Sequence, residues 1–267
     1  MSRTLRIAAI QSASLPYDRA KLDYFLTLAK GKEAQVVVLG EYLLNLFFRE
    51  LLTTPLSMIA EQSQRQVENL TQLARIYKVP IIAPLVTIKN GNPLKGLYLF
   101  EEEKSRFWSQ QILMPYHHWN EAAFFANKPT ALKTPPVVNI GGIKIGLLMG
   151  FETHFPQLWE KLSQKKVDVV ITPTAATFES QKRWRELLHT MAFLHHCYVL
   201  RVNRIGEYGE GSFSWRFYGD SFLVDPFGLT VDALGEEEAM MVVDIERDQV
   251  VEARETWQFS SIAHARR

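Results

Sequence analysis

The sequence predicts an α/β layered fold, and three observations support this class. Short apolar runs rich in β-branched residues recur along the chain, bounded by Gly, Pro or Asn as buried strands usually are. One-sided helical patterns lie between several of these runs. The last third of the chain has strand-like runs with few helical patterns, which indicates antiparallel pairing there.

The expected strands follow the apolar runs, and the expected helices follow periodic apolar faces. Strands are predicted at residues 6–11, 35–40, 80–88, 143–149, 167–173, 197–203, 219–225 and 239–245. Helical faces are formed by Leu22, Phe25, Leu26 and Ala29, by Val67, Leu70, Ala74 and Tyr77, and by Trp184, Leu187, Leu188, Met191 and His195. KNGNP (89–93) and DPFGL (225–229) carry turn signals. Because no Pro/Gly/Ser-rich linker interrupts the chain, we expect a single domain over residues 1–267.

Composition and charge narrow the classes of function. The chain has 267 residues, with 30 basic and 29 acidic side chains interspersed and a net charge of +1. This balance provides no basic stripe for nucleic acid or an anionic membrane, so we expect a small-molecule ligand or a protein partner. No apolar run approaches the roughly 18 residues of a membrane span, and the first residues do not resemble a signal peptide. The single cysteine, Cys197, fits a reducing compartment, and we expect a cytoplasmic protein.

Generic functional motifs are weak. GGIKIG (141–146) lacks the spacing of a dinucleotide-binding loop, and GDS (219–221) lacks the context of a nucleophile elbow. The histidines do not form an H-E-x-x-H motif, which disfavours a metal site. Cys197 opens an apolar run, where a cysteine usually behaves as a small buried hydrophobe rather than a catalytic thiol.

Three positions remain whose residue types fit one chemistry. Glu41 directly follows QVVVLG, and the carboxyl ends of strands are where α/β sheets gather their ligands. Glu121 lies in HHWNEAAFF, among aromatic residues that would desolvate its carboxylate. The third position is the turn at Gly150, where IKIGLLM ends and GFETHFP begins. The plainer alternatives are a solvated acid or helix cap for Glu41 and a helix-terminal acid for Glu121.

Seven segments in order resemble the carbon–nitrogen hydrolase, or nitrilase, superfamily from about residue 5 to residue 255. They are AAIQSAS (8–14), VVVLGEYLL (36–44), PYHHWNEAAFF (115–125), IKIGLLMGFETHFPQLW (143–159), VVITPTA (169–175), RWRELLHTMAFLHHCYVLRVNRIG (183–206) and YGDSFLVDPFGL (218–229). The resemblance implies a four-layer α-β-β-α sandwich that hydrolyses amides or nitriles without a metal or organic cofactor. It also implies assembly into a homodimer or a higher homo-oligomer.

Members of this superfamily work with a Glu, a Lys and a Cys, together with a second Glu. A thiolate attacks the carbonyl or nitrile carbon, one Glu transfers protons, and the Lys ammonium stabilises the developing anion. By motif position, Glu41 matches the general base and Glu121 the second Glu. The Lys of the Lys-x-His-Leu-Pro-like string falls on Gln111 in QILMP, and the Cys falls on Gly150. The resemblance places the following residues around the altered site: Gln111, Gly150, Phe151, Glu152 and His154.

Three hypotheses follow from the loss of both the thiol and the ammonium. The first is a pseudoenzyme that retains the pocket and binds a small amide-like molecule or a partner protein. The second is an active hydrolase of an amide, N-carbamoyl compound or nitrile that uses an unusual nucleophile or water, with Thr153 and His154 as candidates. The third is an ordinary enzyme with two engineered positions, against which Gly is an odd replacement for a catalytic Cys.

The missing lysine and the glycine each carry a physical expectation. Two desolvated carboxylates without a cation cannot both ionise easily, so one of Glu41 and Glu121 should have a raised pKa. Another cation could approach them, with Arg183, Arg185 and Lys128 as candidates. Gly150 tolerates a positive φ angle, so we expect it to relax a strained turn.

Overall fold

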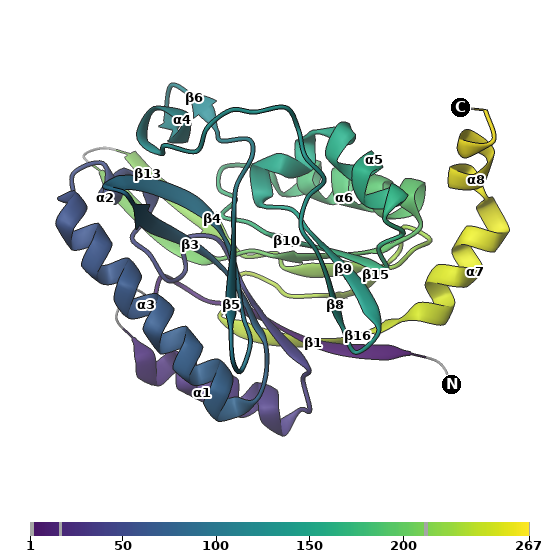
Figure 1. The fold of residues 1–267 in the computed structure, drawn as a ribbon, viewed down its shortest axis with the longest axis horizontal. Coiled ribbons are helices and arrows are strands. Elements are labelled where there is room, and N and C mark those ends of the chain that lie inside the picture. The colour runs from purple at the N-terminus through teal and green to yellow at the C-terminus, as the bar shows by residue number, and fades with distance from the viewer. Residues whose placement is uncertain (1–2, 16–17, 211–212, 267) are drawn as a thin grey trace.

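Two main sheets packed face to face, with helices on both outer surfaces, form the architecture of the chain (Figure 1). The computed structural model describes residues 3–15, 18–210 and 213–266. The first sheet has the strand order β16-β1-β2-β3-β4-β5, and the second has the order β15-β14-β11-β10-β9-β8. In each sheet, three successive neighbours are parallel (β1, β2 and β3, and β9, β10 and β11), and the flanking strands are antiparallel.

The strands of the first sheet come from both ends of the chain. They are β1 (Thr4–Gln11), β2 (Val36–Leu39), β3 (Ile81–Lys89), β4 (Asn92–Phe100), β5 (Ser105–Ser109) and β16 (Ala239–Glu246). The strands of the second sheet are β8 (Val137–Ile140), β9 (Ile143–Leu147), β10 (Val169–Pro173), β11 (Tyr198–Val202), β14 (Phe222–Val224) and β15 (Thr230–Ala233). Two further hairpins are formed by β6 (Pro115–Tyr116) with β7 (Trp119–Asn120) and by β12 (Ile205–Glu210) with β13 (Phe213–Tyr218).

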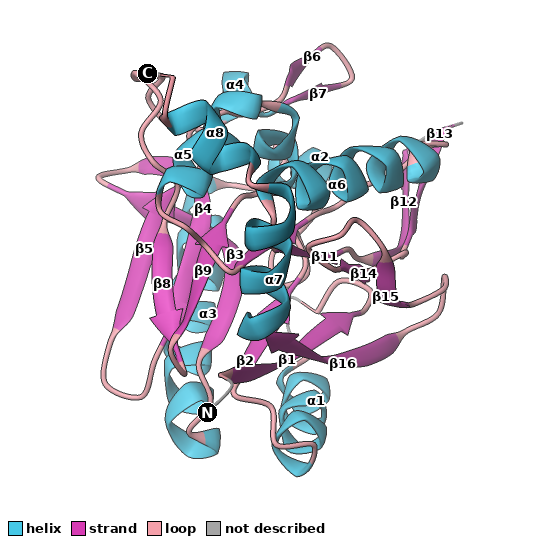
Figure 2. Ribbon diagram, turned by 90° about the vertical axis from the view of Figure 1, so that its right-hand side faces the viewer, coloured by secondary structure: helices cyan, strands magenta, loops and turns pink. Residues whose placement is uncertain are grey.

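Helices cover the two sheets from opposite sides, and the C-terminal helices extend along one edge (Figures 1 and 2). The first sheet is covered by α1 (Arg19–Gly31) and α3 (Leu56–Tyr77), and the second by α5 (Pro156–Gln164) and α6 (Gln181–His195). The shorter elements are α2 (Phe48–Leu51), α4 (Glu121–Phe124) and the 3-10 helix η1 (Gly150–His154), and the chain ends with α7 (Arg247–Trp257) and α8 (Phe259–His264). Among the described helices, none is both long and apolar enough to cross a membrane.

Three apolar clusters define the four layers. The cluster between the sheets includes Val38 of the first sheet and Ile171 of the second. A second cluster joins the inner faces of α1 and α3 to the first sheet, and a third joins α5 and α6 to the second sheet through residues such as Trp159 and Leu188. Because each sheet is apolar on both faces, each must be covered on both. The predicted α-β-β-α sandwich is therefore confirmed.

The predicted elements match the structure well, but several strands were missed. All eight predicted strands and the three helical faces are present, and the last third pairs antiparallel as expected. The KNGNP turn joins β3 to β4, with Lys89 opposite Asn92. The apolar pattern did not predict β4, β5, β6, β7, β8, β12, β13 or β15, and the omission of β4 matters for the site. The single domain over 1–267 stays a prediction, and residues 1–2, 16–17, 211–212 and 267 lie outside the described part.

Candidate functional site

Glu41 lies where the ends of the two sheets approach each other. Gly40 precedes it, and a Cβ atom at this glycine would lie 3.3 Å from the backbone of Asn203 and Val202, so a larger residue would crowd β2 against the end of β11. The backbone N–H of Glu41 donates to the carbonyl of Thr174 at 3.2 Å. Tyr42 then turns the chain with a φ of 54°, a strained value for a bulky residue. The Glu41 side chain is buried at this junction.

Glu121 is fully buried and begins the short helix α4 directly after the β6-β7 hairpin. The side chain of Asn120 caps this helix by accepting from the N–H of Ala123. The Tyr42 hydroxyl donates to Glu121 Oε1 at 2.6 Å, and the Trp119 indole N–H donates to the same oxygen at 3.0 Å. Glu121 is thus held by Tyr42, which is distant in sequence, and by the adjoining hairpin residue Trp119.

Lys95 brings an ammonium group between the two glutamates. It lies on β4, and its Nζ is 2.6 Å from Glu121 Oε1 and 3.5 Å from Glu41 Oε2. The same Nζ lies 4.7 Å from the centre of the Tyr42 ring. The Asn127 side chain bonds to both the N–H and the carbonyl of Lys95, which fixes this part of β4. We call Glu41, Tyr42, Lys95 and Glu121 the acid–lysine cluster.

Gly150 faces this cluster from the second sheet, at the start of η1 after β9. Its backbone N–H donates to Glu41 Oε1 at 3.1 Å. A Cβ atom at position 150 would lie 3.4 Å from Pro173 O and Thr174 Cγ2 and 3.5 Å from Glu41 Oε1, which are ordinary contact distances. The expectation that Gly150 relaxes a positive φ was wrong, because its φ lies outside the left-handed region. Position 150 has room for a side chain beside Glu41.

Gln111 does not bring its side chain into the acid–lysine cluster. Its amide donates to the carbonyl of Lys133 at 3.1 Å and accepts from the Lys133 N–H at 2.7 Å. Only its backbone is tied to this region, through an N–H bond of 2.6 Å to Glu152 Oε1. The cations proposed from the sequence lie elsewhere as well. Arg185 pairs with Asp220, and Arg183 and Lys128 are exposed.

The other predicted site residues surround Gly150 in different roles. Glu152 is buried and accepts from the backbone N–H groups of Met149 and Gln111, so its carboxylate joins η1 to the loop after β5. Thr153 donates its hydroxyl to the carbonyl of Gly150 at 2.5 Å. His154 is exposed, and its Nδ1 lies 3.1 Å from the carbonyl of Phe151. Neither Thr153 nor His154 is arranged as an activated nucleophile with its base.

Burial and charge set the protonation of the cluster. Burial raises the pKa of Glu41 to about 7, the charge of Lys95 opposes this shift, and the charge of Glu121 adds to it. Burial disfavours the Lys95 ammonium, but the two carboxylates outweigh it and raise its pKa. Burial also keeps the pKa of the Tyr42 phenol well above its ordinary value, so it remains a neutral donor. The raised carboxyl pKa was expected from a missing cation; that premise was wrong, because Lys95 supplies a cation, and burial is the main cause of the shift.

Aromatic side chains cover the acid–lysine cluster. Trp119 packs against Tyr42, Phe47 and Trp215, with ring centroids 6.4, 5.0 and 5.5 Å apart, so the β6-β7 and β12-β13 hairpins meet above Glu121. Tyr116 contacts the ring of Phe151 at 5.6 Å. The cluster side chains are almost inaccessible to solvent in this structure. A ligand therefore reaches them only when part of this cover moves.

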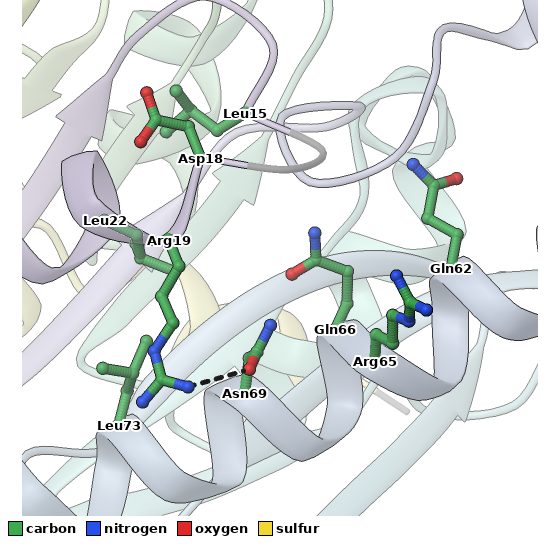
Figure 3. Close-up of a pocket in the computed structure, with 9 residues that line it drawn as sticks. All are labelled: Leu15, Asp18, Arg19, Leu22, Gln62, Arg65, Gln66, Asn69 and Leu73. Atoms are coloured by element: carbon green, nitrogen blue, oxygen red, sulfur yellow. Dashed lines mark hydrogen bonds between the residues drawn. The ribbon is translucent and has the colours of Figure 1, made fainter.

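Two other features of the molecule do not belong to this site. Cys197 lies in the apolar cluster under α5 and α6, where burial raises its thiol pKa to about 12. A cavity of about 140 Å³ lies between α1 and α3, outside the first sheet, and the guanidinium of Arg19 at its edge bonds to Asn69 (Figure 3). None of the cluster residues lines this cavity. Within the described residues, no group of three or more His, Cys, Asp or Glu side chains could hold a metal ion.

The four-layer sandwich, with two buried glutamates around a shared ammonium, has the architecture that the resemblance to carbon–nitrogen hydrolases implies. The family model described as carbon-nitrogen hydrolase matches residues 5–255, and the chain belongs to this family.

Comparisons with individual proteins agree with this assignment. The chain is 27% identical over 149 residues to a deaminated glutathione amidase from Synechocystis sp., covering 55% of this chain and 52% of that protein. It spans about half the length, or less, of several curated relatives that it matches. It is 22% identical to the 2-oxoglutaramate amidase of Bacillus subtilis over 90% of this chain and 89% of that protein.

Solved structures share the fold at low sequence identity. A carbon–nitrogen hydrolase from Helicobacter pylori G27 superposes with a TM-score of 0.86 at 20% identity, covering 97% of this chain and 94% of that one. A mutant of the amidase from Nesterenkonia sp. AN1, in complex with butyramide, gives a TM-score of 0.78 at 22% identity, covering 96% and 97%. These likenesses concern the fold.

Proposed function

We propose that this carbon–nitrogen hydrolase family protein no longer hydrolyses through a cysteine and instead binds a small amide-like molecule in the acid–lysine cluster. The observation that carries the proposal is the glycine at position 150, which faces Glu41 where the family motif has its thiol. The single thiol of the chain, Cys197, is buried in a different apolar cluster. The acids and the ammonium nevertheless remain together.

The loss of the nucleophile outweighs what the remaining groups can contribute to catalysis. Removing the nucleophile of a coupled catalytic set typically lowers kcat by about 10⁴–10⁶, because the base and the anion stabiliser then have no covalent step to assist. Binding is a separate matter, since groups that contact the ground state keep their contribution without the nucleophile. A family scaffold that keeps both glutamates therefore suits ligand binding better than turnover.

The chemistry of the cluster suits a neutral amide. An amide carbonyl can accept from the Lys95 ammonium or the Gly150 N–H, and an amide N–H can donate to Glu41 or Glu121. A bound carboxylate would meet two acidic side chains and only one cation, which disfavours anionic groups at this point. The names of the relatives, which include glutathione-derived and oxoglutaramate amidases, also favour amides.

A second candidate function is hydrolysis by an activated water. The raised pKa of Glu41, about 7, is the observation that favours it, because a carboxylate with that pKa is a competent general base near neutral pH. The geometry of Thr153 and His154 does not favour either residue as the nucleophile. Water activation by Glu41 is thus the form in which residual catalysis is best tested.

One experiment separates these functions. Purified protein is titrated with butyramide, an N-carbamoyl amino acid and a small nitrile by calorimetry, and ammonia release is followed in the same samples. We expect saturable heat with an amide and no ammonia above background. Glu41→Gln serves as the comparison, because it removes the base while keeping the shape of the side chain.

The outcomes assign the function directly. Ammonia release that disappears in Glu41→Gln would establish the second candidate and remove the first. Absence of both heat and ammonia across the panel would exclude a small amide-like ligand, leaving the partner-protein form of the hypothesis. Saturable binding without turnover would support the proposed function.

Assembly and location remain part of the proposal. We propose a homodimer or a higher homo-oligomer in the cytoplasm, with no nucleic acid or membrane partner, on the basis of family resemblance and balanced charge. Light scattering coupled to size-exclusion chromatography measures the mass directly, and a monomeric mass would exclude the oligomer.

A further inference from the structure

The acid–lysine cluster contains a cation that the family motif does not place there. The motif assigns its lysine to position 111, where this chain has Gln111 with its side chain bonded to Lys133. The ammonium of the cluster comes instead from β4. We propose that Lys95 is a migrated active-site lysine, which supplies from a different strand the positive charge that the motif supplies from position 111.

The position of the Lys95 charge decides what the site lacks for thiol chemistry. If the positive charge has moved rather than disappeared, then position 150 lacks only its sulfur. The inference rests on the proposed function, because it takes the cluster as the retained ligand site of the protein. It adds that the charge pattern for thiol chemistry is still complete.

The contacts of Lys95 are those of a shared active-site cation rather than of a simple ion pair. Its Nζ contacts one oxygen of Glu121 and one oxygen of Glu41, while the other Glu41 oxygen accepts from the N–H of Gly150. Lys95 and position 150 therefore lie on the two sides of one carboxylate. A charge at Lys95 acts on an anion at position 150 within a buried, weakly screened environment.

The space at position 150 also supports the proposal. A Cβ atom there would make ordinary contacts with Pro173, Thr174 and Glu41, so a cysteine fits without displacement of the backbone. Glu41 Oε1 lies 3.5 Å from this Cβ atom, and its carboxylate is the group that would accept the thiol proton.

The charged and titratable groups around Lys95 are the groups whose removal could change the pKa of a thiol at position 150. They are Glu41, Glu121 and the Tyr42 phenol, and Glu152 is near enough for its pKa to be affected by the Lys95 charge. Lys95 is the cation in this set. Removal of its charge should therefore raise the pKa of a thiol at position 150, whereas removal of an acid should lower it.

The test introduces the missing thiol and titrates it. In Gly150→Cys, the thiol proton passes to Glu41, the sulfur attacks the methylene carbon of iodoacetamide, an S–C bond forms, and iodide leaves. Labelling rates are measured between pH 5 and pH 10 by mass spectrometry, with peptide mapping to separate position 150 from the buried Cys197. The midpoint of the rate profile reports the apparent pKa of the introduced thiol as it titrates together with Glu41.

The key comparison is made in proteins that also carry Glu121→Gln, so that the loss of Lys95 does not leave Glu121 buried without a cation. Lys95→Gln alone leaves Glu121 buried without its cation, so Gly150→Cys/Glu121→Gln is compared with Gly150→Cys/Glu121→Gln/Lys95→Gln. We expect the midpoint to rise by about one pH unit or more and labelling at pH 7 to slow by about tenfold when Lys95 is replaced. Lys95→Arg in the Gly150→Cys protein keeps the positive charge and should leave the midpoint of that protein unchanged.

Matched controls and a clear contrary result complete the test. Lys128→Gln removes an exposed lysine and should leave the midpoint unchanged, as should Gln111→Ala at the motif position. Equal midpoints with and without Lys95, in variants with similar melting temperatures, would show that Lys95 only supports the fold. That result would overturn the inference.

The inference and the proposed function can fail separately. Labelling at position 150 needs no native ligand, so a Lys95-dependent midpoint in a protein that binds no amide would remove the proposed function and retain the migrated lysine. Amide binding with a Lys95-independent midpoint would retain the proposed function and remove the migrated lysine.

Discussion

Two of the buried ion clusters among the described residues differ in composition, and the difference separates structure from function. The acid–lysine cluster has one ammonium shared by two glutamates. The second, which we call the arginine cluster, pairs buried Arg201 with Asp220 at 3.1 Å, and Arg185 approaches the same carboxylate. The first has an excess of acids, and the second has an excess of cations.

The arginine cluster satisfies its groups with fixed partners. Arg201 donates to Asp220, to the Tyr218 hydroxyl and to Thr174, and its guanidinium lies 5.0 Å from the ring centre of Trp184. A planar guanidinium held in this way has no proton to exchange near neutral pH. Such a cluster stabilises one arrangement of strands and has little scope for chemistry.

The acid–lysine cluster keeps one group poised to change its charge. Glu41 has a pKa of about 7 because it is buried beside Glu121 with only a shared cation. Buried groups with strongly shifted pKa values concentrate at functional sites, because function needs charges that respond. This difference fits a structural role for the arginine cluster and supports the proposed binding role of the acid–lysine cluster.

Removal of each cation gives the largest expected effect and tests this assignment. Lys95→Met leaves two buried carboxylates without a cation, and we expect a loss of about 3–5 kcal/mol in the free energy of unfolding at pH 8. The loss should shrink at pH 5, where the carboxyls can protonate. Arg201→Met should cost less and depend less on pH, because Asp220 retains Arg185. Urea denaturation at both pH values measures this, and a pH-independent loss for Lys95→Met would contradict the assignment.

The titration of Glu41 gives the next effect, and its sign follows from its raised pKa. The folded protein holds the Glu41 proton up to about pH 7, whereas the unfolded chain releases it near pH 4.5. Between these values the folded state binds more protons, so stability falls as pH rises through this window and stays lower above pH 7. The expected loss is on the order of 3 kcal/mol for a shift of this size.

The Glu41→Gln variant isolates this contribution. His195 acts in the opposite direction, because burial lowers its pKa to about 4 and its stability contribution is lost as pH falls from about 6.5 to 4. The difference in urea midpoint between wild type and Glu41→Gln removes the His195 contribution, which is common to both. We expect Glu41→Gln to be the more stable protein at pH 8 and to lose that advantage by pH 5. A constant difference across this range would show that Glu41 does not titrate there.

The same two clusters show what the sequence could and could not predict. Periodicity located the parallel strands, because apolar residues on both sides of a strand leave a continuous pattern, and three of the helices that cover them, but not α5. The order of motifs brought Glu41, Glu121 and Gly150 to one site, and the structure places Gly150 and Glu41 in direct contact. These features can be predicted because they depend on the periodicity and the order of residues along the chain.

Two buried cations, Lys95 and Arg201, were missed, although each has a local signal. Lys95 alternates with Leu97 and Leu99 on the inner face of β4. Because residues 92–100 were not identified as a strand, nothing in the predicted fold indicated that the Lys95 side chain faces the core. Arg201 lies inside the predicted strand 197–203, where a charged residue in an apolar run should have suggested a buried partner. The direction of the Gln111 side chain has no such signal, because it depends on a bond to Lys133 in a distant loop.

The smallest expected effect concerns two glycines, one beside each cluster. Gly150→Ala should change the unfolding free energy by less than about 1 kcal/mol, because its φ is accessible to alanine and a Cβ would make ordinary contacts. Gly219, next to Asp220, has a φ of +71°, and a Cβ there would lie 2.6 Å from the backbone oxygen of Gly235. Gly219→Ala should therefore cost roughly 1–3 kcal/mol. Urea midpoints of the two variants measure the contrast. An equal cost in the free energy of unfolding would show that the fold itself requires glycine at position 150.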